Sequence, residues 1–220
     1  MKLARQFAIA LCLFFPPAAI HAGDPKPSEK ILFQSSFASA KTDAPPDGFM
    51  ILGGEFKVQE MDSKKILELP GSPLDDFGAL FGPAQGENVV VRARIRSEGS
   101  RRLAPRFGVG LNGASGYRLL VVPSRKEVQL FKDQEAIASA PFEWESGAWT
   151  RLHLQVRKIS DGKWRVEGKA WTDGKAEPPQ WTITFDATAA PTAGKASVWG
   201  APYSGKPVQF DELIVSSIDG

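Results

Sequence analysis

Hydrophobic and polar residues alternate with a period of two along most of the chain. In the run ENVVVRARIRS, Val89, Val91, Ala93 and Ile95 share one parity, and arginines occupy most of the other. This is the period of a β-strand with one face in the core. The runs WTRLHLQVRK and KWRVEGKAW repeat it, and the Asp161-Gly162 dipeptide between them is one that tight hairpins prefer. These runs therefore predict a half-buried strand and a β-hairpin.

Further short runs have the length and composition of strands, and turn residues separate them. They are ILFQSSF, EFKVQEM, KILELP, FGALFG, RFGVGLN, GYRLLVV, EVQLFK, QWTITFD, ASVWG and VQFDELIVSS. The segment SRKEVQLFKDQEAIASA also fits a helix, with Val128, Phe131 and Ala138 at nearly helical offsets. We favour strands there, because Val128 and Leu130 fit a strand that ends in a turn at Lys132–Gln134.

About a dozen strands without helical spacers predict an antiparallel fold, because parallel strands need long crossover connections. A double-sheet jelly roll accommodates that many strands. We therefore expect an all-β, two-sheet jelly-roll sandwich.

The first 22 residues have the order of a secretory signal peptide. Lys2 and Arg5 precede an apolar run over Phe7–Phe15, and small residues end at Ala22. A membrane helix needs about 20 apolar residues, and no run of that length occurs. We therefore expect a secreted or periplasmic protein without a transmembrane segment.

A lipoprotein signal is the alternative for this leader. It would use Cys12, but the preceding Leu11 is bulky where lipidation needs a small residue. The polar, proline-bearing stretch 23–30 is then a loose lead-in, and residues 31–217 suit one domain.

Removing the leader changes the charge and the cysteine content. The chain has 27 Lys and Arg, 25 Asp and Glu, and one Cys. The leader holds Lys2, Arg5 and Cys12 and no acidic residue, so 25 basic and 25 acidic residues and no cysteine remain. Nucleic acid is not an expected partner, because its binding needs a basic excess. Disulfides, thiol catalysis and cysteine-bound zinc are excluded from the mature chain.

Four stretches carry a family resemblance. They are ILFQSSF with GFMILGGEFKVQE, GYRLLVV with EVQLFKD, SGAWTRLHLQVRKISDGKWRVEGKAW, and PVQFDELIVSS. In this order they resemble the concanavalin A-like lectin/glucanase superfamily, in its laminin-G-like jelly-roll branch, and they span nearly all of residues 31–217. The chain also resembles a narrower relative, the secreted 3-keto-disaccharide hydrolase-like domain. The resemblance implies a jelly roll that binds or processes glycans.

Catalytic carboxylates of this superfamily are not evident in the chain. Laminarinase-type members carry a Glu-x-Asp-x-x-Glu strand motif, which does not occur here, and retaining glycosidases need two carboxyl groups ~5 Å apart. Glu143 and Glu145 flank Trp144, but the surrounding proline and Ser-Gly pair favour a turn. Ser115 in GASGYR also fits a turn better than a nucleophile elbow. No catalytic residue is assigned.

Asp211 is the candidate for a structural calcium site. The jelly-roll branch often binds calcium with one acid in its closing strand and another near its first strand. Asp211 in QFDEL has the closing position, but Gln34-Ser35-Ser36 stands where the second acid is expected. Calcium takes six or more oxygen ligands. We therefore expect no cofactor and little or no stabilisation by calcium.

Two candidate binding residues share the polar parity of the hairpin with arginines. His153, the only histidine after the leader, lies between Arg151 and Gln155, and we expect it on the solvated face. Trp171 shares the parity of Arg165 and is the best candidate for an exposed aromatic, with packing under the TDGKAEPP loop as the alternative.

The remaining aromatic candidates differ in their surroundings. Trp199 and Tyr203, in the loop-rich stretch WGAPYSGKP, are the second choice for a binding site. Trp164 and Trp181 share parity with apolar residues, and we expect both in the core.

The polar parity also forms a basic row that permits an acidic glycan, although such rows are usually plain solvated faces. Its members are Arg92, Arg94, Arg96, Arg151, Arg157 and Arg165.

Three functions fit these observations. We expect a secreted or periplasmic jelly roll that binds glycan or glycoconjugate, without catalysis, through an aromatic-bearing sheet face or loop rim. The alternatives are a glycoside-processing hydrolase of the 3-keto-disaccharide type and a structural or protein-binding domain.

Overall fold

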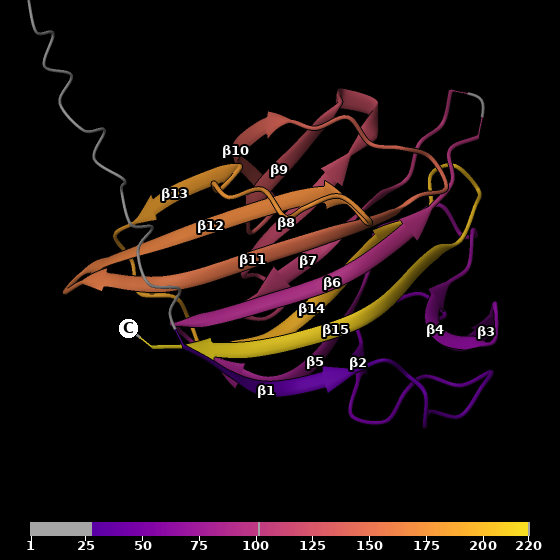
Figure 1. Ribbon diagram of the computed structural model, residues 1–220, viewed down its shortest axis with the longest axis horizontal. Coiled ribbons are helices and arrows are strands. Elements are labelled where there is room, and N and C mark those ends of the chain that lie inside the picture. The colour runs from indigo at the N-terminus through magenta and orange to yellow at the C-terminus, as the bar shows by residue number, and fades with distance from the viewer. Residues whose placement is uncertain (1–27, 101, 220) are drawn as a thin grey trace, which may run out of the picture.

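The computed structural model of the protein describes residues 28–100 and 102–219 and is almost entirely β-structure (Figure 1). The predicted signal peptide and the first part of the lead-in lie outside the described residues. Strand β1 spans Glu29–Ser35, so the domain begins two residues before its predicted start. No helix in the described part of the chain has the length and apolar composition needed to cross a membrane.

Two antiparallel sheets contain all the strands. The eight-stranded sheet, called sheet A, has the order β13-β12-β11-β6-β15-β4-β3, and β1 pairs with β15 beside this path. Its strands are β13 (Ile183–Ala187), β12 (Lys163–Thr172), β11 (Trp149–Ser160), β6 (Val89–Ser97), β15 (Val208–Ile218), β4 (Lys64–Leu69), β3 (Lys57–Met61) and β1.

The seven-stranded sheet, called sheet B, has the order β10-β9-β8-β7-β14-β5-β2. Its strands are β10 (Glu135–Pro141), β9 (Glu127–Lys132), β8 (Tyr117–Val122), β7 (Arg106–Leu111), β14 (Gly194–Ala201), β5 (Phe77–Gln85) and β2 (Met50–Ile51). The predicted jelly-roll sandwich is confirmed.

The alternation of the sequence sorts side chains between the core and the outer faces of the sandwich. Leu154 of sheet A and Val109 of sheet B are fully buried in one apolar cluster that both sheets build. Burying each such side chain stabilises the fold by about 1.5–3 kcal/mol. The sheets approach closely at Gly168, where a Cβ atom would lie 2.7 Å from Leu119 Cδ1.

The ambiguous segment before residue 141 is two strands, as favoured. A single 3₁₀ turn, η1 (Pro123–Arg125), precedes β9, and β9 and β10 pair across a tight turn. The predicted hairpin at Asp161-Gly162 joins β11 to β12, and Gly162 has a φ of +72° that favours glycine. Trp164 lies in the core, as expected.

The closing strand β15 changes partners along its length. Val208–Phe210 pair with β4 on one side, whereas Leu213–Ile218 pair with β1 on that side. The register against β6 shifts between Asp211 and Ile214, and Glu212 has a φ of +51° there. This bulge lets one strand hold β6 on one side and two successive strands on the other (Figure 1).

Candidate functional site

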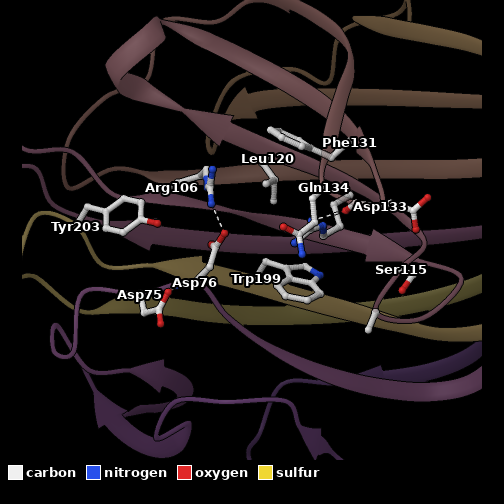
Figure 2. Close-up of a pocket in the computed structure, with 12 residues that line it drawn as sticks. Asp75, Asp76, Arg106, Ser115, Leu120, Phe131, Asp133, Gln134, Trp199 and Tyr203 are labelled. Atoms are coloured by element: carbon white, nitrogen blue, oxygen red, sulfur yellow. Dashed lines mark hydrogen bonds and ion pairs between the residues drawn. The ribbon is translucent and has the colours of Figure 1, made fainter.

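A hollow of about 750 Å³ lies on the outer face of sheet B (Figure 2). Its volume is within the range of small-molecule sites. Strands β7, β8, β9 and β14 supply its floor, and two groups of loops supply its rims. The floor includes Arg118, Leu120, Phe131 and Trp199; one rim has Asp75, Asp76 and Tyr203, and the other has Ser115, Asp133 and Gln134.

Trp199 lies over glycines of the two neighbouring strands. Gly78 of β5 and Gly108 of β7 stand opposite Trp199 in the sheet register. A Cβ atom at Gly78 would lie 2.8 Å from the indole, and one at Gly110 would lie 3.2 Å from its Nε1 atom. Nε1 donates a hydrogen bond of 2.8 Å to Ser197 Oγ. The absence of side chains at these glycines leaves room for the indole against the sheet.

Arg118 packs on the same floor from β8. Its guanidinium carbon lies 4.5 Å from the Trp199 ring centroid and 6.0 Å from the Phe131 centroid. Nη2 donates a hydrogen bond of 2.7 Å to the carbonyl oxygen of Asp133. Burial lowers the pKa of Arg118, because the charged guanidinium is desolvated. The floor thus combines aromatic rings with a buried cation.

The first rim presents polar groups to the hollow. Arg106 Nη2 donates to the carboxylate of Asp76, and the Arg106 guanidinium carbon lies 5.9 Å from the Tyr203 ring centroid. Tyr203 is 36% exposed and marks the open edge of the hollow (Figure 2). This arrangement offers hydrogen-bonding groups beside apolar ring surface.

Of the predicted site residues, the structure brings Trp199 and Tyr203 together at this hollow. Trp199, at the end of the predicted strand ASVWG and the start of a loop-rich stretch, lies in β14 and is only 8% exposed. Arg106 and Arg118 were missed. The signal for Arg106 was the run RFGVGLN, in which Gly108 and Gly110 share its parity and leave space on the outer sheet face.

The other predicted ligand-binding residues lie on the opposite outer face, on sheet A. The segment 173–182 between β12 and β13, here called the strap, folds over part of that face. Its Glu177 contacts His153 Nδ1 and Lys169 Nζ, each at 3.1 Å, and its Trp181 ring lies edge-on to His153 with 4.7 Å between centroids.

The strap overturns two predictions and supports one alternative. His153 was expected on a solvated face, but it is only 5% exposed. Trp181 was expected in the core, but it lies outside the strands and is half-buried on the strap against His153. Trp171 is not the exposed aromatic; it is 9% exposed and lines a cavity of about 130 Å³ together with Glu177, as the alternative of packing under this loop predicted. For His153 and Trp171, parity assigned the sheet face correctly but did not show that the strap covers it.

Burial and pairing shift two pKa values under the strap. Burial lowers the pKa of His153, and so favours a neutral ring that donates Nδ1–H to Glu177. Nε2 of His153 is buried and has no partner among the described residues. Hydrogen bonds from His153 and then Lys169 lower the pKa of Glu177 to about 2. Glu177 thus pairs with both His153 and Lys169, and only His153 Nε2 is left without a partner in the described residues.

Acidic residues pair with the predicted basic row. Two of the pairs are Arg151 with Asp173 and Arg165 with Asp186. Partial burial raises the pKa of Asp173, but hydrogen bonds from Arg151 and Arg94 outweigh this effect and lower it. The remaining pairs are Arg92 with Glu29, Arg94 with Asp173, Asp211 and Glu212, Arg96 with Glu98, Arg151 with Glu212, and Arg157 with Glu167. The row is therefore largely neutralised.

Asp211 is buried in this network. Its Oδ2 accepts a hydrogen bond of 2.8 Å from Arg94 Nη2, and its Oδ1 accepts one of 2.8 Å from the Glu212 backbone N–H. Within residues 28–100 and 102–219, no three His, Cys, Asp or Glu side chains are grouped so that they could hold a metal ion. The structure places Asp211 in an ion pair.

The weaker catalytic candidates lie in loops. Glu143 and Glu145 are exposed between β10 and β11, where the Ala148 N–H donates to the Glu145 carbonyl oxygen in a turn. Glu143 lies 3.4 Å from Lys126 Nζ. Ser115 is exposed in the β7–β8 loop, and its carbonyl oxygen accepts a hydrogen bond from Lys132.

No family model and no curated protein matches the chain. Several solved structures do. A carbohydrate binding module, CBM66 from Bacillus subtilis, matches with a TM-score of 0.54 and 13% identity over 77% of this chain and 96% of its own. The potassium-bound carbohydrate recognition domain of Emp46p matches with 0.56 and 9%, over 82% of this chain and 94% of its own.

A third similar structure is an enzyme. The marine PL-14 alginate lyase from Aplysia kurodai matches with a TM-score of 0.57 and 10% identity, over 86% of this chain and 99% of its own. At these identities the matches show a shared fold, which is consistent with the concanavalin A-like resemblance.

Proposed function

We propose that this protein is an exported glycan-binding domain and that the hollow on sheet B is its binding site. One observation carries the proposal. The Trp199 ring lies over glycines of the two neighbouring strands, beside Tyr203 and the Arg106–Asp76 pair. Aromatic rings contact the apolar faces of sugars, and convergent polar groups fix the hydroxyls.

The fold neighbours support this proposal only in part. Two of them are named as a carbohydrate binding module and a carbohydrate recognition domain, whereas a third is a lyase. One fold hosts many functions, so the site has to carry the argument. The site holds no assigned catalytic residue, and we propose binding without catalysis.

Export is part of the same proposal and rests on the leader. We expect the mature chain to begin at Gly23, after the small residues that end at Ala22. N-terminal sequencing of protein recovered outside the cytoplasm tests it; an intact Met1 in that protein contradicts it.

The binding site is tested with a matched pair of tryptophan variants. Trp199 and Trp171 are 8% and 9% exposed, but they lie on the outer faces of different sheets. We expect Trp199→Phe to weaken glycan binding by about tenfold, which is 1.4 kcal/mol, and Trp171→Phe to leave it unchanged. Isothermal titration calorimetry against a panel of acidic and neutral oligosaccharides measures both. Equal losses in the two variants contradict the assignment.

The same samples separate binding from catalysis. After incubation, mass spectrometry of the oligosaccharide should return it unchanged. Released products would favour the glycoside-processing alternative, including the 3-keto-disaccharide type.

A further inference from the structure

Arg118 differs from the other arginines of the described strands. Every other one forms an ion pair with a carboxylate, and all of them are more exposed than Arg118, which is 8% exposed. Among the described residues, Arg118 has no carboxylate partner; its contacts are one carbonyl oxygen and two aromatic rings. It is thus a buried cation with no carboxylate at ion-pair distance in the described residues, and the Asp76 and Asp133 carboxylates interact with it only at longer range.

Most hydrogen-bond donors of Arg118 have no acceptor in the part of the protein that the structure describes. A guanidinium has five N–H donors in a fixed fork. One of them, on Nη2, reaches the carbonyl oxygen of Asp133, and the buried Nε–H has no acceptor in the described residues. Burying a charged group without full pairing is costly. A bound anion would supply the missing charge and the missing acceptors.

The surroundings hold this guanidinium in place at the hollow. Trp199 and Phe131 lie on it, and the Asp133 carbonyl oxygen fixes Nη2. Arg118 and these three residues all line the hollow. A charged group that is already oriented loses little entropy when it binds a ligand.

The other charged groups of the hollow are largely occupied or peripheral. Asp76 pairs with Arg106, and the carboxylate of Asp133 is 69% exposed and lies 3.9 Å from Lys132 Nζ. Asp75 is exposed on the rim and accepts the N–H of Asp76. These contacts leave Arg118 as the unpaired charge on the floor.

We propose that the glycan taken by this hollow carries an anionic group, the carboxylate of a uronic acid or a sulfate ester, and that Arg118 binds that group. This inference rests on the proposed function and names its substrate class. Arginine is suited to it because its fork matches planar carboxylates and sulfate oxygens with two parallel hydrogen bonds.

The test compares ligands that differ only in charge. The first pair is trigalacturonic acid and its carboxyl-reduced form, and the second is trimannuronic acid and its carboxyl-reduced form. The third pair is a sulfated carrageenan disaccharide and its desulfated form, which contains no uronic acid. We expect at least one acidic member to bind about tenfold or more tightly than its uncharged counterpart, and its affinity to fall as ionic strength rises.

Variants of one side chain assign the preference to Arg118. In Arg118→Met, which keeps an apolar side chain of similar length, we expect the acidic ligand to bind no better than its counterpart. Arg118→Lys should keep part of the preference, because it retains the charge but not the fork. Arg165→Met is the control. Arg165 pairs with Asp186 on the outer face of sheet A, away from the hollow on sheet B, so this variant should keep the full preference.

Thermal melting separates a binding role from a structural one. Replacing an unpaired buried charge with an apolar side chain is often neutral or stabilising, so Arg118→Met should melt no lower than the wild type. A much lower melting temperature in that variant would assign Arg118 to the fold and overturn the inference.

The possible binding results are distinguishable. Equal binding of acidic and neutral members overturns the charge preference and leaves glycan binding standing. A preference that survives in Arg118→Met overturns the role of Arg118. If no member of any pair and no neutral oligosaccharide of the wider panel binds, the proposed function fails, and this inference fails with it.

Discussion

Gly78 and Trp199 stand opposite each other on β5 and β14, and the indole occupies the volume in which a side chain at position 78 would lie. The nearest indole atom would be 2.8 Å from a Cβ atom at that position. Separations this short do not occur between real side chains. The ring can therefore take this position only because residue 78 is a glycine and has no side chain.

Gly78→Ala should displace this ring. The new methyl group forces the indole away from the sheet, so we expect a loss of about 1–3 kcal/mol in the free energy of unfolding, together with weaker glycan binding. Urea denaturation followed by tryptophan fluorescence measures the first effect, and calorimetry measures the second.

Gly99→Ala is the control for that substitution. A Cβ atom at Gly99 would have its nearest neighbour at 3.5 Å, an ordinary contact. This variant should bind glycan like the wild type. If Gly78→Ala also bound glycan like the wild type, the absence of a side chain at position 78 would have no role in placing Trp199.

The strap makes the stability of the fold depend on pH in the acidic range. The pKa of Glu177 is about 2 in the folded protein against an ordinary 4.5, so its stabilising contribution is present above pH 4.5 and is lost as the pH falls toward 2. The pKa of His153 is lowered below its ordinary 6.5 in the folded state. Protonation below pH 6.5 therefore favours the unfolded chain, in the same direction.

Glu177→Gln isolates the carboxylate contribution. We expect a loss of about 1 kcal/mol at pH 7, a figure reduced for solvent screening because Glu177 is partly exposed. Denaturation curves at pH 7, 5 and 3 should show wild type and variant converging as the pH falls. A constant difference at all three values would show that the ionised carboxylate contributes nothing.

Asp211 should matter through its ion pair with Arg94. Asp211→Ala removes a buried carboxylate, although Asp173 still pairs with Arg94, so we expect a loss of about 2–3 kcal/mol in the free energy of unfolding. The matched control is Asp186→Ala, which breaks the more exposed pair with Arg165 and should cost clearly less than Asp211→Ala. Similar losses in the two variants would contradict the role of burial.

Calcium should leave stability unchanged. The carboxylate of Asp211 already accepts hydrogen bonds from Arg94 and from a backbone N–H, and calcium needs several oxygen ligands. Differential scanning calorimetry with added calcium, and then with chelator, should give the same melting temperature. A rise of many degrees with calcium would point to a metal site.

Sequence parity was sufficient to predict the sandwich. Leu152 and Leu154 face the core, and Arg151 and His153 point to the other face, as the period of two requires. The same rule could not show what covers an outer face. The strap has no periodic pattern; its cover was foreseen only as an alternative for Trp171 and not for His153.

The candidate site was predictable in part. Trp199 and Tyr203 were singled out as aromatics, but their common location depends on how β14 pairs with β5 and β7. Those pairings join residues far apart in the chain, which local patterns do not specify. Arg118 was unremarkable in the sequence because its lack of a carboxylate partner is a property of the assembled sheet.

The position of β15 also has a consequence for folding. Within the described residues this strand lies inside sheet A and is the only strand that pairs with β1. Without Val208–Ile218, β1 would be unpaired and one edge of β6 would be open. Sheet A can therefore close only when segments from opposite ends of the domain meet, and pairings of such high sequence separation slow folding.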